Sequence, residues 1–264
     1  MTDPPDAPRP RPTLPAAARG RTDGGVAVIG VVAEVLLTLG ALTLLFVAWQ
    51  LWIGDWIGAA QKNAAGSSIS RQWAEAPPPA PAAATPGPTA TASAAPVAPV
   101  VLPQPKDAQI FGVMHVPRFG ADYSVPVAGG VTRPRTLDPI GIGHYPGTPM
   151  PGALGNVALA GHRTTFGKPF NRIADLRIGD AIVIETKAGW YTYRFRNLEY
   201  VRPDAVDVLL PTPQRTDVAA TGRYLTMTSC SPMYFKSERI IAYSVFESFT
   251  PRGDPPPVSL AAVS

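Results

Sequence analysis

Prolines divide this chain more sharply than any other residue type. Of its 32 prolines, six lie in 1–25, ten in 76–105 and four in 251–257. All eight tyrosines and eight of the nine phenylalanines lie instead in 106–250. A packed core needs such large side chains, whereas proline-rich stretches bury too little apolar area to offset their ordering entropy. The pattern predicts one folded domain at 106–250, with a disordered head at 1–25 and a disordered tail at 251–264.

A long apolar stretch precedes the central proline-rich segment. Glu34 is the only charged residue between Val26 and Ile53, and about 20 apolar residues span the hydrocarbon core of a bilayer. Tryptophans gather at its C-terminal end and arginines precede it, which is typical of a span with a cytoplasmic N-terminus. We therefore expect a single-pass transmembrane signal anchor at 26–53, with the folded domain outside the cell. A signal peptide cleaved near Gly58 is the alternative.

The segment that follows, 54–105, is rich in Pro, Ala and Thr in its second half. Such low-complexity sequence is extended and semi-rigid, so we expect an extracytoplasmic linker that spaces the domain from the membrane.

Composition also excludes several kinds of site. A single cysteine rules out an intrachain disulfide and any metal site built from several thiolates. The net charge of +4 is too small to indicate a nucleic-acid-binding protein. No glycine-rich loop follows a predicted strand, so the sequence shows no nucleotide-phosphate site. We expect no metal, no cofactor and no nucleic-acid partner.

Short strands between turn residues fill the domain. Apolar, β-branched and aromatic runs predict strands at 110–116, 123–127, 156–160, 181–186, 190–200, 224–229 and 239–249. A helical turn or two is expected at 170–176. This spacing indicates a β-barrel or sandwich whose helices are confined to connections.

Cys230 is the candidate nucleophile. It ends a predicted strand in front of Pro232, at a position where sites are often built. A nucleophilic thiol needs a partner that lowers its pKa or carries protons. Of the three histidines, His162 directly follows a strand and a glycine, while His115 and His144 fit ordinary hydrogen-bonded roles. The alternative is an unreactive cysteine buried in the core.

Arg239 opens the strand that follows Cys230. If the two strands pair antiparallel, the two residues lie near the same end of the hairpin. A guanidinium there can hold a substrate carbonyl or stabilise an oxyanion, although most arginines are simply solvated surface groups.

Together these residues resemble the sortase family. The resemblance rests on Gly161–Arg163 after a strand, on the strand end Leu225–Cys230, which is similar to the family's TLxTC pattern, and on Arg239. The stretches His144–Gly152 and Asn156–Arg163 are similar to the class E sortases of actinobacteria. The resemblance implies a mainly β fold: a closed eight-stranded barrel with short connecting helices, after one transmembrane helix and a Pro/Ala-rich linker.

The resemblance also implies a reaction and a role for each site residue. Cys230 would be the nucleophile, His162 the general acid and base, and Arg239 the group that binds the signal and stabilises the oxyanion. Thr228 and Tyr145 would bind substrate, with Tyr145 linked to a preference for LAxTG over LPxTG. The enzyme would cleave a C-terminal sorting signal between Thr and Gly and transfer the surface protein to an amine of a lipid II-like cell-wall precursor.

Three other functions remain open. An L,D-type cysteine transpeptidase is disfavoured because no glycine precedes Cys230. A pilin-polymerising sortase is disfavoured because 251–264 holds no second span and 76–105 holds no clear lid motif. A non-enzymatic β-domain that binds wall polymer would leave Cys230 buried.

Overall fold

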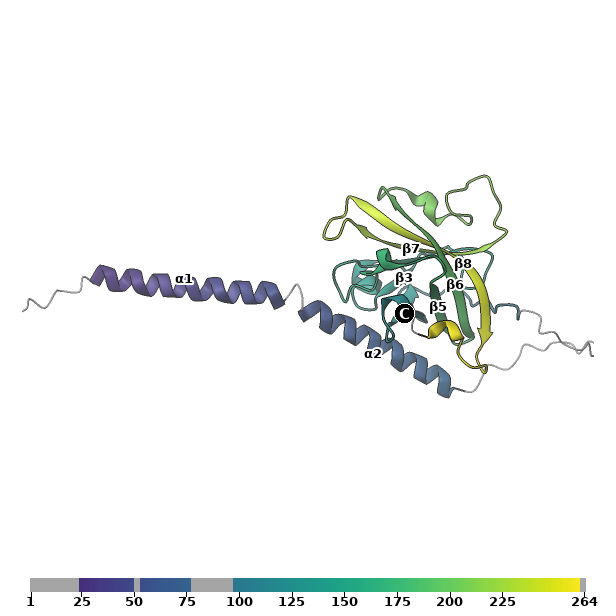
Figure 1. Ribbon diagram of the computed structural model, residues 1–264, viewed down its shortest axis with the longest axis horizontal. Coiled ribbons are helices and arrows are strands. Elements are labelled where there is room, and N and C mark those ends of the chain that lie inside the picture. The colour runs from purple at the N-terminus through teal and green to yellow at the C-terminus, as the bar shows by residue number, and fades with distance from the viewer. Residues whose placement is uncertain (1–23, 50–52, 77–96, 262–264) are drawn as a thin grey trace, which may run out of the picture. The chain divides into compact units, whose positions relative to one another are not determined.

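The structure is a computed structural model that describes residues 24–49, 53–76 and 97–261 (Figure 1). The head at 1–23, the residues 50–52 of the predicted span, the linker at 77–96 and the tail residues 262–264 lie outside the described residues. The chain forms two compact units, one up to Trp49 and one from Gln50 onward.

The first unit contains one apolar helix, α1 (Gly24–Ala48, 25 residues). Its segment Ala27–Ala48 has the length and composition of a membrane span, and none of it is buried within the protein. A helix that is apolar on every side needs an apolar environment. The helix is therefore a candidate membrane anchor, and a signal sequence would share these properties.

In the second unit, the described residues contain eight strands that close into a barrel. The order around the barrel is β1-β2-β3-β4-β7-β8-β6-β5. The strands are β1 (Ile110–His115), β2 (Ser124–Gly129), β3 (Ile142–His144), β4 (Gly155–Gly161), β5 (Ala181–Thr186), β6 (Gly189–Val201), β7 (Arg223–Ser231) and β8 (Glu238–Pro251). Two neighbouring pairs, β2–β3 and β4–β7, are parallel, and the others are antiparallel. The predicted closed eight-stranded barrel is confirmed.

Seven of these strands match the runs predicted from the sequence pattern. The eighth, β3, has only three residues, too few to show the alternation that marks a strand. The helices that connect the strands are short, as expected, and the predicted helical turn at 170–176 contains a single 3₁₀ turn at Ile173–Asp175.

Large apolar side chains fill the barrel. Those that are fully buried include Met114, Ile142, Leu159, Ile184, Tyr191 and Met227. Both faces of β5 are covered, since all six of its residues are buried. On one side a second small cluster forms from Ala181, Val183 and Trp190, with Leu260 packed against it.

That cluster corrects the expectation of a disordered tail for residues 251–261. Arg252 is buried, pairs with Glu185 at 2.9 Å, and places its guanidinium 4.2 Å from the centre of the Trp190 ring. It also donates to the carbonyl of Thr186. A charge bound in this way holds the segment to the barrel despite its prolines.

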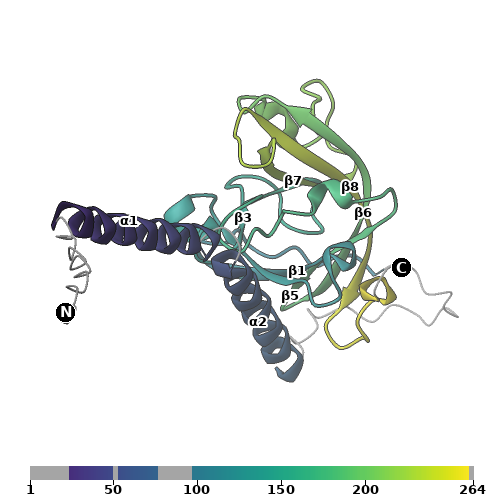
Figure 2. The ribbon, with the colours of Figure 1, turned by 60° about the vertical axis from the view of Figure 1, so that its left-hand side comes forward.

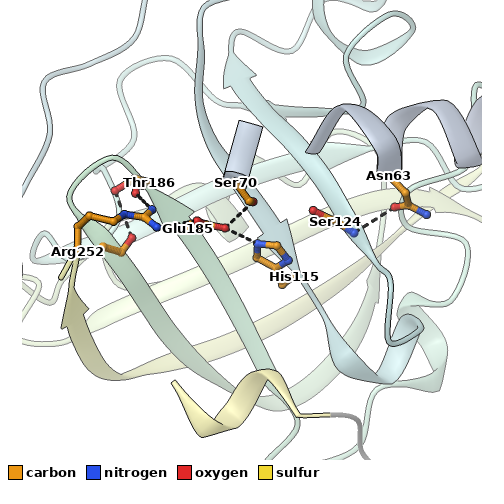
Figure 3. Close-up of polar contacts among 8 residues, drawn as sticks. Asn63, Ser70, His115, Ser124, Glu185, Thr186 and Arg252 are labelled. Carbon is orange, nitrogen blue, oxygen red and sulfur yellow. Dashed lines mark hydrogen bonds and ion pairs between the residues drawn. The ribbon is translucent and has the colours of Figure 1, made fainter. Parts of the chain in front are cut away.

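The structure also differs from the expected linker. Within 54–105, Gly54–Glu75 form a 22-residue helix, α2, that packs against β2 and β1 (Figure 2). Four of the residues through which it contacts the barrel and its loops are spaced four apart and share one helix face: Gly58, Lys62, Gly66 and Ser70. The Ser70 hydroxyl donates to Glu185 at 2.6 Å, and the Asn63 side-chain oxygen accepts from the Ser124 amide at 3.1 Å. Figure 3 shows both bonds.

Small residues allow this close docking. A Cβ at Gly66 would lie 2.0 Å from the Ser124 carbonyl oxygen, so only glycine fits there. The barrel-facing side of α2 is small and polar, and a helix without an apolar stripe gives no periodic signal in the sequence.

Candidate active site

Cys230 and Arg239 face each other across a hairpin. The antiparallel pairing of β7 and β8 places them directly opposite in register. Opposite residues in such a pair project to the same side of the sheet with their Cβ atoms about 5 Å apart. The expected meeting of the two residues at one end of the hairpin is confirmed.

The parallel pairing of β4 and β7 adds His162. Ala160 is paired with Thr228, so His162 and Cys230 each lie two residues further along neighbouring strands. The Ser229 hydroxyl donates to the Gly161 carbonyl at 2.7 Å and ties the two strand ends together. His162 directly follows β4, Cys230 lies on β7 and Arg239 lies on β8. These three strands are consecutive in the barrel order, so the imidazole, the thiol and the guanidinium come from neighbouring strands.

All five residues singled out from the sequence line one cavity of about 480 Å³: Tyr145, His162, Thr228, Cys230 and Arg239. The Cys230 thiol is free and half-buried, at a wall of this cavity and not in the core. Tyr145 and Thr228 are joined by a hydrogen bond of 3.0 Å between their hydroxyls. A small molecule or an extended peptide can thus reach the thiol.

The cavity is electropositive. Among the described residues that line it, Arg133, Arg163, Lys236 and Arg239 are cationic and none is acidic. Arg239 donates through Nη1 to the carbonyls of Lys236 and Glu238, at 3.1 and 2.8 Å, which leaves the rest of its donor fork for a ligand. Cationic residues around the cavity would stabilise the negative charge that develops on a carbonyl oxygen when a nucleophile attacks the carbonyl carbon.

The other two histidines lie apart from this cavity. His144 is buried and its ring bonds to Thr148 and to the Pro149 carbonyl at 3.0 Å. Burial lowers the pKa of His144, against the opposing effect of the Pro149 bond, so it remains neutral and structural. His115 pairs with Glu185 at 2.8 Å.

Several further residues of the site carry no clear sequence signal. The Asp138 carboxylate bonds to His162 at 2.6 Å, and the Phe166 ring packs against the imidazole of His162. Arg163 is buried and donates to the Cys230 carbonyl at 3.3 Å; only its place next to His162 could have suggested it. On the β7–β8 loop, Tyr234 is 76% exposed at the rim of the cavity.

Comparisons with known proteins agree with this geometry. A family model described as a sortase domain matches residues 114–247. Sortase SrtE1 of Streptomyces coelicolor is 33% identical over 265 residues, which span 98% of this chain and 68% of that relative. The SrtA sortase from Actinomyces oris has a TM-score of 0.59 at 33% identity, over 61% of this chain and 93% of its own. The crystal structure of sortase E1 from Streptomyces coelicolor, with a tripeptide in the active site, has a TM-score of 0.55 at 36% identity, over 58% and 98%.

Proposed function

The chain belongs to the sortase family as a class E-like member, and from that premise we propose how it selects, cleaves and transfers its substrate. As a cysteine transpeptidase it acts on proteins that carry a sorting signal and passes them to a cell-wall amine. We assign it a C-terminal signal of the LAxTG or LPxTG type, cut between Thr and Gly. The acceptor is the amine of a lipid II-like precursor, so surface proteins become attached to the wall.

One observation carries this assignment: Cys230, His162 and Arg239 line a single cavity, with Cys230 and Arg239 opposite each other. Access to the thiol argues against the buried, unreactive cysteine of a simple wall-binding domain. The cationic walls favour a reaction that passes through an oxyanion.

In the first half of the reaction, the Cys230 thiolate attacks the carbonyl carbon of the signal's threonine. Arg239 stabilises the negative charge that develops on the carbonyl oxygen. As the C–N bond breaks, His162 protonates the departing glycine amine. A thioester on Cys230 remains, and the exchange of one amide for another is thereby divided into two easier steps.

In the second half, the acceptor amine attacks the thioester carbonyl. His162, now neutral, takes the proton that the amine loses, and Cys230 leaves as a thiolate. The products are the new amide and the regenerated enzyme. Tyr145 and Thr228, joined by their hydroxyls on the cavity wall, contact the signal beside the scissile bond.

We assign α1 the role of a single-pass anchor with a cytoplasmic N-terminus, from its apolar length and the arginines that precede it. The catalytic barrel then lies outside the cell. Both substrates of the reaction are found at that membrane face, so anchoring raises their effective concentration.

The test uses the full chain in detergent with LAxTG and LPxTG peptides and a primary amine. We expect an amine-exchanged peptide from at least one signal, and no product from Cys230→Ala or His162→Ala. Ser231→Ala, which alters the neighbouring residue, is the matched control and should retain activity. Exchange that survives in Cys230→Ala would show that another group is the nucleophile.

A further inference from the structure

The imidazole of His162 is held by two neighbouring side chains, Asp138 and Phe166. Its Nε2 atom lies 2.6 Å from the Asp138 carboxylate. The two side chains are only 13% and 22% exposed, so water competes weakly for this bond. A short, shielded bond between an imidazole and a carboxylate fixes the direction of the ring.

That bond also selects one tautomer. An ionised carboxylate can only accept a hydrogen bond, so the proton on the neutral ring belongs to Nε2. The other nitrogen, Nδ1, is then the one that takes up and releases a proton.

A second contact holds the ring from its face. The Phe166 ring lies 5.2 Å from that of His162 at an interplanar angle of 32°. Arg133 links the two supports, since its guanidinium lies 5.7 Å from the Phe166 ring and its Nε 3.5 Å from Asp138. The imidazole is therefore held both at its edge and at its face.

The helix α2 holds both supports in turn. Lys62 is 8% exposed and donates to the backbone carbonyls of Asp138 and Pro139, at 2.8 and 3.1 Å. Burial lowers the pKa of Lys62, opposed by the nearby Asp138 charge. A lysine placed among carbonyl oxygens in this way fixes the backbone that carries Asp138.

The loop that carries Phe166 is strained and lies against the same helix. Phe166, Gly167 and Lys168 have φ values of 52°, 76° and 41°, a conformation that non-glycine residues avoid. Gly58 of α2 lies so close to Gly167 that a Cβ on Gly167 would stand 2.8 Å from the Gly58 carbonyl carbon. Such a conformation persists only where the surroundings hold it.

We propose that Asp138 is a positioning residue for His162, and that α2 keeps Asp138 in place through Lys62. The proposal rests on the proposed function, because it assigns His162 the proton transfers of that reaction. Asp138 acts on the ring and not on the substrate. Its loss should therefore lower kcat and leave KM nearly unchanged.

The first experiment compares Asp138→Asn with Asp138→Glu in the full chain, by peptide exchange at saturating amine. We expect kcat of Asp138→Asn to fall at least about tenfold and Asp138→Glu to recover part of the loss, because it restores a carboxylate. A kcat for Asp138→Asn within about twofold of the parent would overturn the proposal.

A second measurement does not depend on turnover. The chain has three histidines, so ¹⁵N labelling of histidine gives few ring signals, and His162→Ala identifies those of His162. We expect the parent to show a proton on Nε2 of neutral His162, and Asp138→Asn to change the His162 signals alone. Unchanged His162 signals would refute the positioning role even if no peptide were ever exchanged. Absence of exchange together with the expected signals would refute only the proposed function.

The role of α2 is tested with Lys62→Met, which keeps an unbranched side chain, one atom shorter, and removes the ammonium. Arg71→Met, on the exposed side of the same helix, is the matched control. We expect Lys62→Met to lower kcat several-fold and to shift the His162 ring signals, while Arg71→Met does neither. Identical behaviour of the two variants would remove α2 from the proposal, and thermal unfolding shows that both are folded.

Discussion

At the scale of residues, the small number of cysteines and histidines narrowed the choice of candidate reacting groups. The chain has one cysteine and three histidines, so few arrangements of a thiol and an acid–base group are possible. Asp138 could not be found in the same way, because the chain has 19 acidic residues. Nothing in the local sequence marks the one that meets His162 across 24 positions. The contact exists only because the segment before β3 lies beside the end of β4.

Tyr145 is the residue that we expect to govern signal choice. Its hydroxyl bonds to Thr228, two residues before Cys230. Tyr145→Leu should change the ratio of kcat/KM for LAxTG and LPxTG peptides, because it removes both the ring and the bond from the cavity wall. Tyr145→Phe removes only the bond, worth about 1 kcal/mol or a fewfold change. An unchanged ratio in Tyr145→Leu would exclude the tyrosine from recognition.

At the scale of elements, the strands followed from their residues better than the helix did. The apolar and β-branched runs predicted seven of the eight strands because each of these strands buries apolar side chains, on both faces in β5. α2 carries no such stripe, since its docking side is built from Gly58, Lys62, Gly66 and Ser70. Its place on the barrel depends on complementary shape and on single polar contacts, which no periodicity reveals.

Gly66 provides a sharp test of that docking. In an exposed helix, Gly→Ala stabilises by about 1 kcal/mol. At Gly66 the added Cβ would lie 2.0 Å from the Ser124 carbonyl oxygen, so we expect Gly66→Ala to lower the Tm and to speed amide exchange in α2. Ser67→Ala, on the exposed side, should leave both unchanged. A Tm that rises in Gly66→Ala would show that the helix does not depend on this contact.

At the scale of the whole molecule, one buried carboxylate joins segments that are far apart in sequence. Glu185 on β5 accepts from Ser70 of α2 and bonds to His115 of β1, while Arg252 brings in the segment after β8 (Figure 3). Burial alone would raise the pKa of Glu185. The bonds from His115, Ser70 and Arg252 outweigh that effect and hold the pKa below its ordinary value of 4.5.

The sign of the pH dependence follows from that shift. A carboxyl whose pKa is lowered by folding contributes stability above its unfolded value, and that stability is lost as pH falls through the folded pKa. We expect the free energy of unfolding to decline below about pH 4.5, and Glu185→Gln to weaken this decline. At neutral pH the same variant should lose about 3–5 kcal/mol, because Arg252 is left buried without its partner.

Denaturant titration of the full chain across this pH range measures both effects. Glu247→Gln is the matched control, since Glu247 pairs with Arg194 at the surface and is 43% exposed. It should change the free energy of unfolding by less than about 1 kcal/mol. A Glu185→Gln variant that matched it at every pH would show that the buried carboxylate does not join these segments.

The positions of the prolines predicted the folded region of the chain only in part. They marked 106–250 as the region that holds the strands, but the folded unit also includes α2 and residues 251–261. Both additions are held by polar contacts with the barrel, through Lys62, Ser70 and Arg252. Amino-acid composition indicates which part of a chain can build a hydrophobic core. It does not reveal segments such as α2 and residues 251–261, which attach to that core by polar contacts.

The parallel pairing of β4 with β7 has a consequence in time. Cys230 and Arg239 belong to one hairpin and are nine residues apart, whereas 68 residues separate His162 from Cys230. Local contacts form early in folding, and contacts that close long loops form late. We therefore expect a folding chain to bring its thiol beside the arginine before the imidazole reaches either of them, so that the candidate site is complete only after β4 has paired with β7.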